Sequence, residues 1–296
     1  DPVLTESTEL LGEQLGTVVE WITRDAMCAG TNVQYASGKT NRLSLEAGDK
    51  LTVTEIRKAV RSLKKAKARM FNNVDGGAVR KPHFVCICSP DATYDLQSDA
   101  LWQDVSKYSD VEQIYSGEIG RLFGVVFVES TEAKVFYQSV HTTVAAHSAG
   151  SAVVTLADIT ESAALYLTAG AKIKIGVTEY TVASCNAAAK TVTLSATVAS
   201  AIAAGTIVYS ENAGAIDATT KKGTDIHATL VFGSDAYGII DVDGEGCLQT
   251  IVKPVGSGGA SDPLDQRATV GAKVAAYTAK ILNNLWIVRI EHGVSL

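Results

Sequence analysis

The densest group of chemically active side chains lies between positions 57 and 81. This stretch carries nine basic residues and one acid, for a local charge of +8, whereas the rest of the chain has 17 basic and 31 acidic residues, for −14. A basic strip on an acidic chain indicates a localised anionic partner, either nucleic acid or an acidic neighbouring subunit. A solvated helix surface is the plainer alternative. The candidate basic face comprises Arg57, Lys58, Arg61, Lys64, Lys65, Lys67 and Arg69.

The sequence contains no signature of catalysis. The motifs G-x-S-x-G, Walker A, H-E-x-x-H and G-x-G-x-x-G do not occur. The five histidines show no metal-ligand spacing on one helical face, and nothing in the sequence places a serine, a histidine and an aspartate together as a triad. We therefore predict that the protein is not an enzyme and holds no cofactor or metal.

Three further motifs match known binding sites only in part. DVDGEG at 241–246 matches the first half of an EF-hand loop, but Val252 stands where a bidentate Glu is required, so we predict a hairpin turn. VGSGGASDP at 255–263 precedes no obvious helix N-terminus for phosphate binding and is interpreted as a surface loop. Cys86 and Cys88 share a strand face and lack a second pair for zinc, which indicates core thiols.

Length and composition indicate a folded protein of about two domains, at roughly 150 residues each. The chain has 296 residues, of which 46% are hydrophobic and 20% charged, with a net charge of −6. This composition excludes disordered and fibrous classes. No stretch of about 18 residues is free of polar groups, so we expect no membrane span. The lack of a recognisable signal peptide and the five scattered cysteines favour a reducing, intracellular origin.

Apolar spacing predicts two long helices. The first covers 2–29 and ends before Gly30. A polar, exposed loop is expected over 31–50. The second helix begins at a threonine cap near 52–54 and runs to about Phe71 with a buried apolar stripe.

Most of the remaining segments read as strands. Buried strands are expected at 83–90 and 124–130, with a short helix at 90–99 between them. Further strands are expected within 226–242 and 249–255. The chain ends as two extended segments that turn at Asn283-Asn284, which is a hairpin signal.

Residues 141–215 differ from the rest of the chain in composition. They contain 20 alanines and only seven charged residues, and their apolar residues alternate with a period of two. Alanine favours helices, but the β-branched residues and the alternation indicate strands. We predict a small inserted all-β domain resembling a thin sandwich, which interrupts a body formed by 1–140 and 216–296.

Six segments in order resemble tailed-bacteriophage major capsid proteins of the coliphage N4-like family. They are PVLTESTELLGEQLGTVVEWITRDAMCAGTNVQYA, LTVTEIRKAVRSLKK, SPDATYDLQSDALWQDVSKYS, GEIGRLFGVVFVEST, TLVFGSDAYG and SGGASDPLDQRATVGAK. The resemblance covers the chain outside 141–215. It implies an α+β, HK97-like capsid fold with a spine helix at 2–29 and with peripheral and axial domains.

The resemblance also implies a function. Such subunits assemble into hexamers and pentamers of an icosahedral head around double-stranded DNA, which contacts the inner face without sequence preference. The implied location is the virion, after assembly in the bacterial host cytoplasm, with no membrane partner. Decoration proteins are expected partners of the insertion, which we expect to point outward. The resemblance also implies an N-terminal arm and an extended loop before the spine helix, and because this sequence starts at that helix we expect a processed or truncated chain.

Two alternatives come from other functional classes. An encapsulin-like nanocompartment shell, which encloses an enzyme cargo, would have the same fold. An enzyme or sugar-binding module housed in 141–215 would need aromatic platforms, and the insertion has few aromatic residues: Tyr166, Tyr180 and Tyr209.

Overall fold

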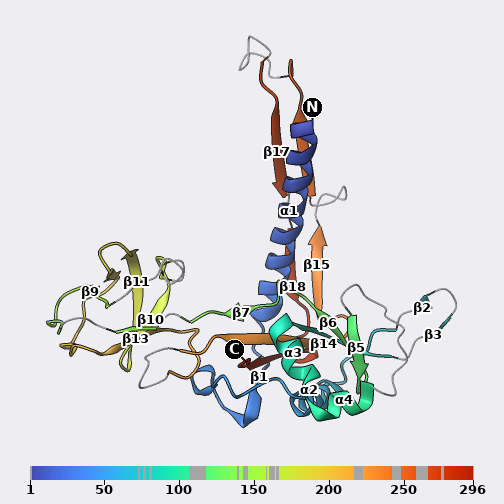
Figure 1. Ribbon diagram of the computed structural model, residues 1–296, viewed down its shortest axis with the longest axis horizontal. Coiled ribbons are helices and arrows are strands. Elements are labelled where there is room, and N and C mark those ends of the chain that lie inside the picture. Colours follow the sequence, from blue (N-terminus) through green and yellow to red (C-terminus); the bar gives the residue numbers. More distant parts are fainter. Residues whose placement is uncertain are drawn as a thin grey trace.

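The protein has an α+β fold with three parts. The computed structural model describes residues 2–72, 74–75, 78–79, 82–106, 118–138, 140–142, 146–157, 159, 164, 167–216, 223–241, 248–257, 266–274 and 277–295. Figure 1 shows a central sheet with its helices, a long stalk that rises from this body, and a β-unit to one side.

The body is built on a seven-stranded mixed sheet. Its strand order is β1 (Val33–Tyr35), β19 (Ile287–His292), β14 (Ile226–Phe232), β4 (Phe84–Cys88), β6 (Val125–Glu129) and β5 (Glu118–Leu122), with β7 (Val135–Phe136) also paired to β14. β1 lies parallel to β19 and β4 parallel to β6, while the other pairs are antiparallel. All seven residues of β14 are buried, as expected for a strand covered on both faces.

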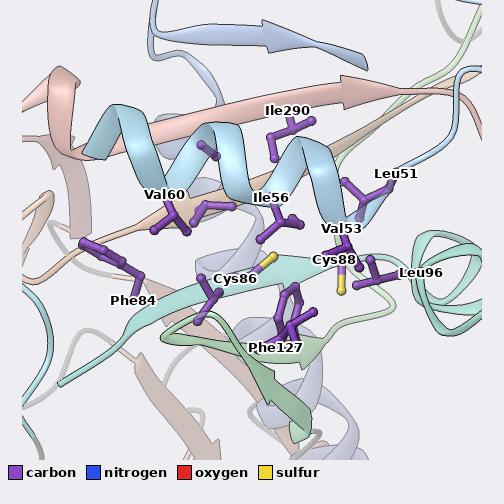
Figure 2. Close-up of a cluster of buried hydrophobic side chains, with 14 of the residues drawn as sticks. Leu51, Val53, Ile56, Val60, Phe84, Cys86, Cys88, Leu96, Phe127 and Ile290 are labelled. Carbon is purple, nitrogen blue, oxygen red and sulfur yellow. The ribbon is translucent and has the colours of Figure 1, made fainter. Parts of the chain in front are cut away.

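Helices α2 (Val53–Lys65), α3 (Pro90–Gln97) and α4 (Ala100–Ser106) cover one face of this sheet. Figure 2 shows the core between α2 and strand β4. Ile56 and Leu63 of α2 pack in one buried cluster with Cys86, Cys88 and Phe127. Cys86 and Cys88 are fully buried, which confirms the interpretation as core thiols. The helix forms because its apolar residues recur every three or four positions and meet this face.

The opposite face of the sheet receives the C-terminal end of α1 (Pro2–Cys28). Met27 and Cys28 pack with Val85, Leu230 and Phe232, which are side chains that alternate with those facing α2. The sheet is therefore a middle layer, and α1 leaves it from the side away from α2. The predicted helix over 2–29 is confirmed.

The stalk consists of α1 and a long two-stranded ribbon. Strand β15 (Tyr237–Asp241) pairs with β18 (Tyr277–Ile281), and β16 (Leu248–Lys253) pairs with β17 (Thr269–Val274). Helix α1 contacts β18, β17 and β16 in turn, and Figure 1 shows it following the ribbon away from the body. At 1.5 Å per residue, 27 residues extend over about 40 Å.

The β-unit corresponds to the alanine-rich segment. Its antiparallel strand order is β8 (Val140–Thr142), β13 (Ile207–Ser210), β10 (Lys172–Ile175), β11 (Thr178–Asn186), β12 (Thr191–Leu194) and β9 (Val153–Thr155). These strands have a buried cluster of their own, which includes Ile173, Val182 and Val192. In the described residues they form one continuous sheet, whereas a sandwich of two sheets was expected. A bulge between Val182 and Ser184 shifts the register within it.

Helix α2 is shorter than predicted. It ends at Lys65, with Ala66 as the C-cap. Lys67 adopts a left-handed φ of 56°, and the amide of Ala68 donates to the carbonyl of Leu63 at 3.0 Å. This is a Schellman ending, which normally uses glycine. The α2 stripe was therefore predicted correctly, but the segment up to Phe71 is not helical.

We expect Lys67→Gly to stabilise the protein by about 1 kcal/mol, because glycine adopts a positive φ without the steric cost of a Cβ atom. Thermal unfolding followed by circular dichroism measures the change. Lys65→Gly is the matched control, since it removes a similar charge from a helical position and should lower the stability. A lower melting temperature for Lys67→Gly would contradict the expectation.

Two loop predictions were wrong because distant strands recruit the segments. Residues 31–50 contain β1, which pairs with β19, and two 3-10 helices, Ala36–Gly38 and Arg42–Ser44, with Leu45 fully buried. The expected hairpin at Asn283-Asn284 does not form, since β18 and β19 belong to different sheets.

The Asn283 side chain instead caps a 3-10 helix, Asn284–Trp286. The remaining described elements are the short strands β2 (Val74–Asp75) and β3 (Ala78–Val79), which pair with each other. Most of the 241–246 motif and residues 258–263 of the Gly/Ser-rich loop lie outside the described residues.

Candidate functional site

A groove lies along the outer side of α2 and unites four of the seven predicted basic residues. Its volume is about 470 Å³, and its lining residues are Arg57, Val60, Arg61, Lys64, Lys65 and Phe123. The four cations are exposed, whereas Val60 is 6% exposed and forms part of the floor. We call this surface the basic groove. In the part of the chain that the structure describes, no ion pair joins these four cations to a carboxylate.

The other three predicted basic residues lie outside the groove. Lys58 is paired with the buried Glu55, 2.7 Å between Nζ and Oε1. Arg69 lies beyond the end of the helix and pairs with Asp235 at 3.4 Å. Lys67 is exposed at the Schellman ending. The prediction of a single basic face was therefore too broad, because the helix on which it depended ends before Arg69.

Phe123 is the residue of the groove that the sequence reasoning missed. It lies in the tight turn between β5 and β6, with φ values of 52° at Phe123 and 77° at Gly124. Both values are those of a type I′ hairpin turn. The ring is 48% exposed, and the Arg57 guanidinium lies 5.3 Å from its centroid. A Phe-Gly pair between two apolar runs was the available signal for the turn.

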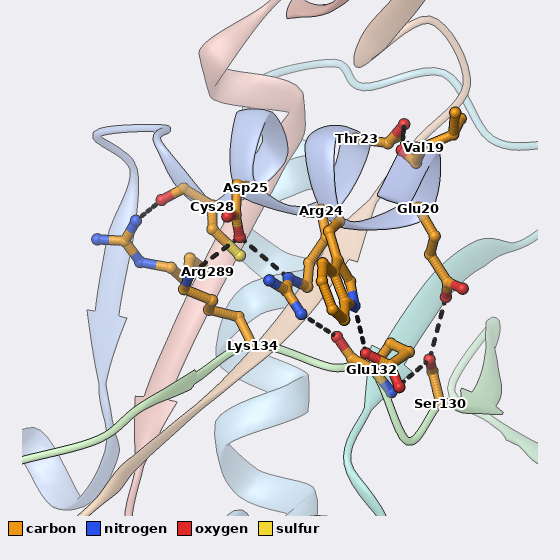
Figure 3. A network of polar contacts seen from close by, with 11 residues as sticks. Val19, Glu20, Thr23, Arg24, Asp25, Cys28, Ser130, Glu132, Lys134 and Arg289 are labelled. Carbon is orange, nitrogen blue, oxygen red and sulfur yellow. Dashed lines mark hydrogen bonds and ion pairs between the residues drawn. The ribbon is translucent and has the colours of Figure 1, made fainter. Parts of the chain in front are cut away.

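The root of the stalk is held to the body by a polar network (Figure 3). Trp21 donates its indole N–H to Glu132, and Arg24 donates to the carbonyl of Glu132 at 2.9 Å. Lys134 pairs with Asp25 at 3.0 Å. Burial of Asp25 raises its pKa, but hydrogen bonds from Arg24 and Lys134 outweigh the burial and lower it. The network fixes where the stalk leaves the body.

Beyond this root the stalk is exposed on its outer sides. No residue of α1 between Val3 and Ala26 is buried, although many are partly covered by the ribbon. Leu10 is 57% exposed, and Ile240 of the ribbon is 54% exposed. Exposed apolar side chains therefore lie on both the helix and the ribbon of the stalk.

A buried charge cluster joins the body to the β-unit. Glu291 is fully buried and receives two hydrogen bonds from Arg42, at 2.8 and 2.6 Å, while Arg289 pairs with it at 2.9 Å. The Arg42 guanidinium also stacks 3.8 Å from the centroid of the Phe136 ring and donates to the side chain of Asn212. Asn212 follows the last strand of the β-unit, so this cluster sets the position of that connection.

The structure brings together one serine, one histidine and one aspartate. The Ser89 hydroxyl lies 2.8 Å from His227 Nδ1, and Asp91 lies 4.0 Å from His227 Nε2. Ser89 is buried, however, and its hydroxyl caps α3 by accepting from the amide of Ala92. A capping hydroxyl beneath the surface is not placed to attack a substrate.

The described residues contain no group of three or more His, Cys, Asp or Glu side chains that could hold a metal ion. No helix in the described ranges is long and apolar enough to cross a membrane. In the β-unit, Tyr180 packs against the core and the hydroxyl of Tyr209 donates to the carbonyl of Gly176. Tyr166 lies outside the described residues.

Comparison with known proteins identifies a family for this chain. Residues 23–184 match the family described as phage capsid protein, and this match covers more than half of the chain. No curated protein matches the chain.

Solved phage capsids are also similar to this chain. The capsid of Ralstonia phage GP4 and that of cyanophage Pam1 are each 13% identical with a TM-score of 0.42, and the match covers 92% and 89% of this chain, respectively. The head of Helicobacter pylori bacteriophage KHP40 is 10% identical with a TM-score of 0.45, and 98% of this chain is covered. The chain spans 54% of the Ralstonia and cyanophage subunits and 68% of the KHP40 subunit.

A capsid family consists of structural proteins, in agreement with the prediction that the protein is not an enzyme. The α+β class is also as predicted, and the long helix beside a ribbon and a central sheet is the organisation expected of an HK97-like subunit. The family match extends over the last six residues of α1, the basic groove and part of the β-unit. The chain belongs to the phage capsid protein family.

Proposed function

We propose that this protein is the major shell subunit of a tailed-phage head, of the coliphage N4-like type. Its copies assemble into hexamers and pentamers that close an icosahedral shell around double-stranded DNA. Membership in the phage capsid family supports a shell role and does not favour the nanocompartment alternative. Assembly takes place in the bacterial host cytoplasm, and the finished protein resides in the virion.

The stalk is the observation that carries this proposal. A helix of 27 residues and its ribbon project from the body and leave large apolar side chains exposed, among them Leu10 and Ile240. In a monomer these apolar side chains stay in contact with water. In a closed shell, neighbouring copies bury them in the same way at every subunit. The basic groove adds a charged contact surface that faces either DNA or an acidic neighbour.

Electron microscopy and sedimentation velocity of the purified chain test the proposal. Shells, rings or capsomer-sized particles that grow with protein concentration are the expected result. The double variant Leu10→Ser, Ile240→Ser removes exposed apolar area and should weaken assembly while leaving the circular dichroism spectrum unchanged. A strict monomer at all concentrations would contradict the proposal.

Residues 141–215 form an outward-pointing insertion that folds independently and offers a surface for decoration proteins. Its separate buried cluster supports this division. The segment that leads from the β-unit back to the body is tightly packed. A Cβ at Gly214 would lie 2.7 Å from the side chain of Ile226, and the Ala215 amide donates to the carbonyl of Leu45 at 2.7 Å. Residues 212–215 therefore pack with the body, although they belong to the proposed insertion by sequence.

We expect the body to keep cooperative unfolding when residues 140–210 are replaced by a short Gly-Ser linker. The Gln138 amide binds Asp225 and Asn212 binds Arg42, so both ends of the excised segment stay anchored to the body. Thermal unfolding with near-ultraviolet circular dichroism measures the outcome. Deletion of 141–215 is the comparison and should be less stable, because it also removes the Asn212 contact. Loss of cooperative unfolding in both deletions would contradict an independent insertion.

A further inference from the structure

The basic groove has a charge-complementary counterpart on the same chain. Glu6, Glu9, Leu10 and Glu13 are all exposed and lie on one side of α1, since they are spaced by three or four residues. We call these four residues the acidic stripe. From Pro2 to Thr23, α1 contains no lysine or arginine, and no ion pair within the described residues involves Glu6, Glu9 or Glu13.

One copy of the chain cannot bring these two surfaces together. The acidic stripe lies in the half of α1 away from the body, whereas α2 lies in the body on the opposite side of the central sheet (Figure 1). Glu13 is 15 residues from the end of α1 at Cys28, which places it about 22 Å along the helix from the body. Contact between these two surfaces therefore requires two molecules.

We infer that the basic groove of one copy receives the acidic stripe of a second copy. This inference rests on the proposed self-assembly and names the surfaces that meet. Charge complementarity is one reason, because four cations that make no ion pair with any described carboxylate would meet a stripe of three carboxylates. Each of the two surfaces also has an apolar part. Leu10 lies among the carboxylates of the acidic stripe, and Val60 and Phe123 line the basic groove together with the cations.

The spacing of the charges defines one orientation. Arg57, Arg61 and Lys64 are separated by steps of four and three residues, whereas Glu6, Glu9 and Glu13 are separated by steps of three and four. Antiparallel helices therefore place all three pairs in register over about 10 Å, whereas parallel helices displace the middle pair by one residue, about 1.5 Å. The pairs are Arg57 with Glu13, Arg61 with Glu9, and Lys64 with Glu6.

Nucleic acid fits the groove less well. Three cations in a row over about 10 Å would contact only about three phosphates of one DNA strand. The DNA backbone offers no apolar group for Val60 and Phe123, and the −14 charge of the remaining chain repels it. An exposed phenylalanine beside arginines is instead typical of the centre of a protein interface.

Charge reversal and restoration test the inference on the full chain. Arg61→Glu should weaken self-association at least about fivefold in sedimentation velocity, and adding Glu9→Arg in the same chain should restore it to within about twofold. Lys67→Glu is the matched control, since it reverses an exposed cation outside the groove and should leave association unchanged. Full association of Arg61→Glu, or no restoration in the double variant, would overturn the inference.

Disulfide trapping provides a second readout. Copies carrying Arg61→Cys, mixed with copies carrying Glu9→Cys, should form a covalent heterodimer under mild oxidation. Val18→Cys replaces Glu9→Cys in the control, because Val18 is exposed and, nine residues from Glu9, lies on the opposite side of α1. Equal trapping by both cysteines would overturn the inference.

The same variants distinguish a nucleic-acid site and a failure of the proposed function. If Arg61→Glu abolished binding to a random-sequence DNA duplex and left association intact, the groove would be a DNA site and the inference would be overturned. If the parent chain remained monomeric at every concentration, the proposed shell function would fail as well. Association of the parent without an effect of Arg61→Glu would overturn only the inference.

Discussion

Replacing Glu291 with glutamine is expected to destabilise the protein by about 3–5 kcal/mol, because it removes the carboxylate that pairs with two guanidinium groups in a buried cluster. Glu291 is fully buried and pairs with both Arg42 and Arg289. Without its charge, two arginines face each other in a region of low dielectric constant. The loss is large because the arginine charges have already been removed from water.

Urea unfolding followed by tryptophan fluorescence measures this effect. Glu179→Gln is the matched control, since Glu179 pairs with Lys172 on the surface of the β-unit and both side chains are about half exposed. Water screens that pair, so its loss should change stability far less. A cost below about 1 kcal/mol for Glu291→Gln would show that the buried cluster is not a major source of stability.

The second large effect is a loss of stability between pH 6.5 and pH 4. His292 is fully buried, and burial lowers its pKa from 6.5 to about 4. Its Nδ1 lies 2.8 Å from the carbonyl of Gly293 and its Nε2 lies 2.9 Å from the Thr229 hydroxyl, so the neutral ring fits both partners. The adjacent His227 ring, 6.1 Å away, also has a lowered pKa because of burial.

The sign follows from proton binding. The unfolded chain binds a proton below pH 6.5, whereas the folded His292 binds one only near pH 4, so folding releases a proton in this interval. The contribution of His292 to stability is complete above pH 6.5 and decreases by about 3 kcal/mol as the pH falls to 4. Asp95 and Glu291 are the acids near His292 that oppose this loss, and Asp91, Asp95 and Asp225 act in the same direction on His227.

Urea unfolding at pH 7.5, 6.0, 5.0 and 4.2 tests the pH dependence. His292→Gln removes the titrating group, so this variant should be less stable at pH 7.5 but should lose less stability on acidification. The aspartates with lowered pKa values, Asp25, Asp49 and Asp95, affect stability mainly below this interval. An equal pH dependence in the parent and the variant would refute the role of His292.

These effects depend on residues that the sequence reasoning did not select. Glu291 and His292 are adjacent in a strand that was expected to form a hairpin with the preceding segment. Their burial results from the position of β19 between β1 and β14. Paired residues in these strands, such as Val33 and Arg289, lie more than 200 residues apart in the chain. Their pairing therefore produces no pattern in the local sequence.

In the candidate site, too, the residues of one helix could be predicted from the sequence, whereas the residue contributed by a distant turn could not. The cations at 57, 61, 64 and 65 were predicted from their spacing on one helix, because residues three and four apart share a helical face. Phe123 completes the groove from a turn 58 residues beyond Lys65, and only packing of the β5–β6 hairpin beside α2 brings them together. The Schellman ending at Lys67 removed Arg69 from the site.

Local sequence patterns were enough to predict the long first helix, the amphipathic second helix, the buried strands with their core cysteines, the β-rich segment at 141–215 and the concentration of positive charge. Each of these depends on periodicity or composition within about 30 residues, which local geometry translates directly into structure. The order of strands in the central sheet, the projection of the stalk, the floor of the basic groove and the buried charge cluster became evident only from the folded chain. These features depend on which distant surfaces bury each other, and that choice is made by packing of the whole chain.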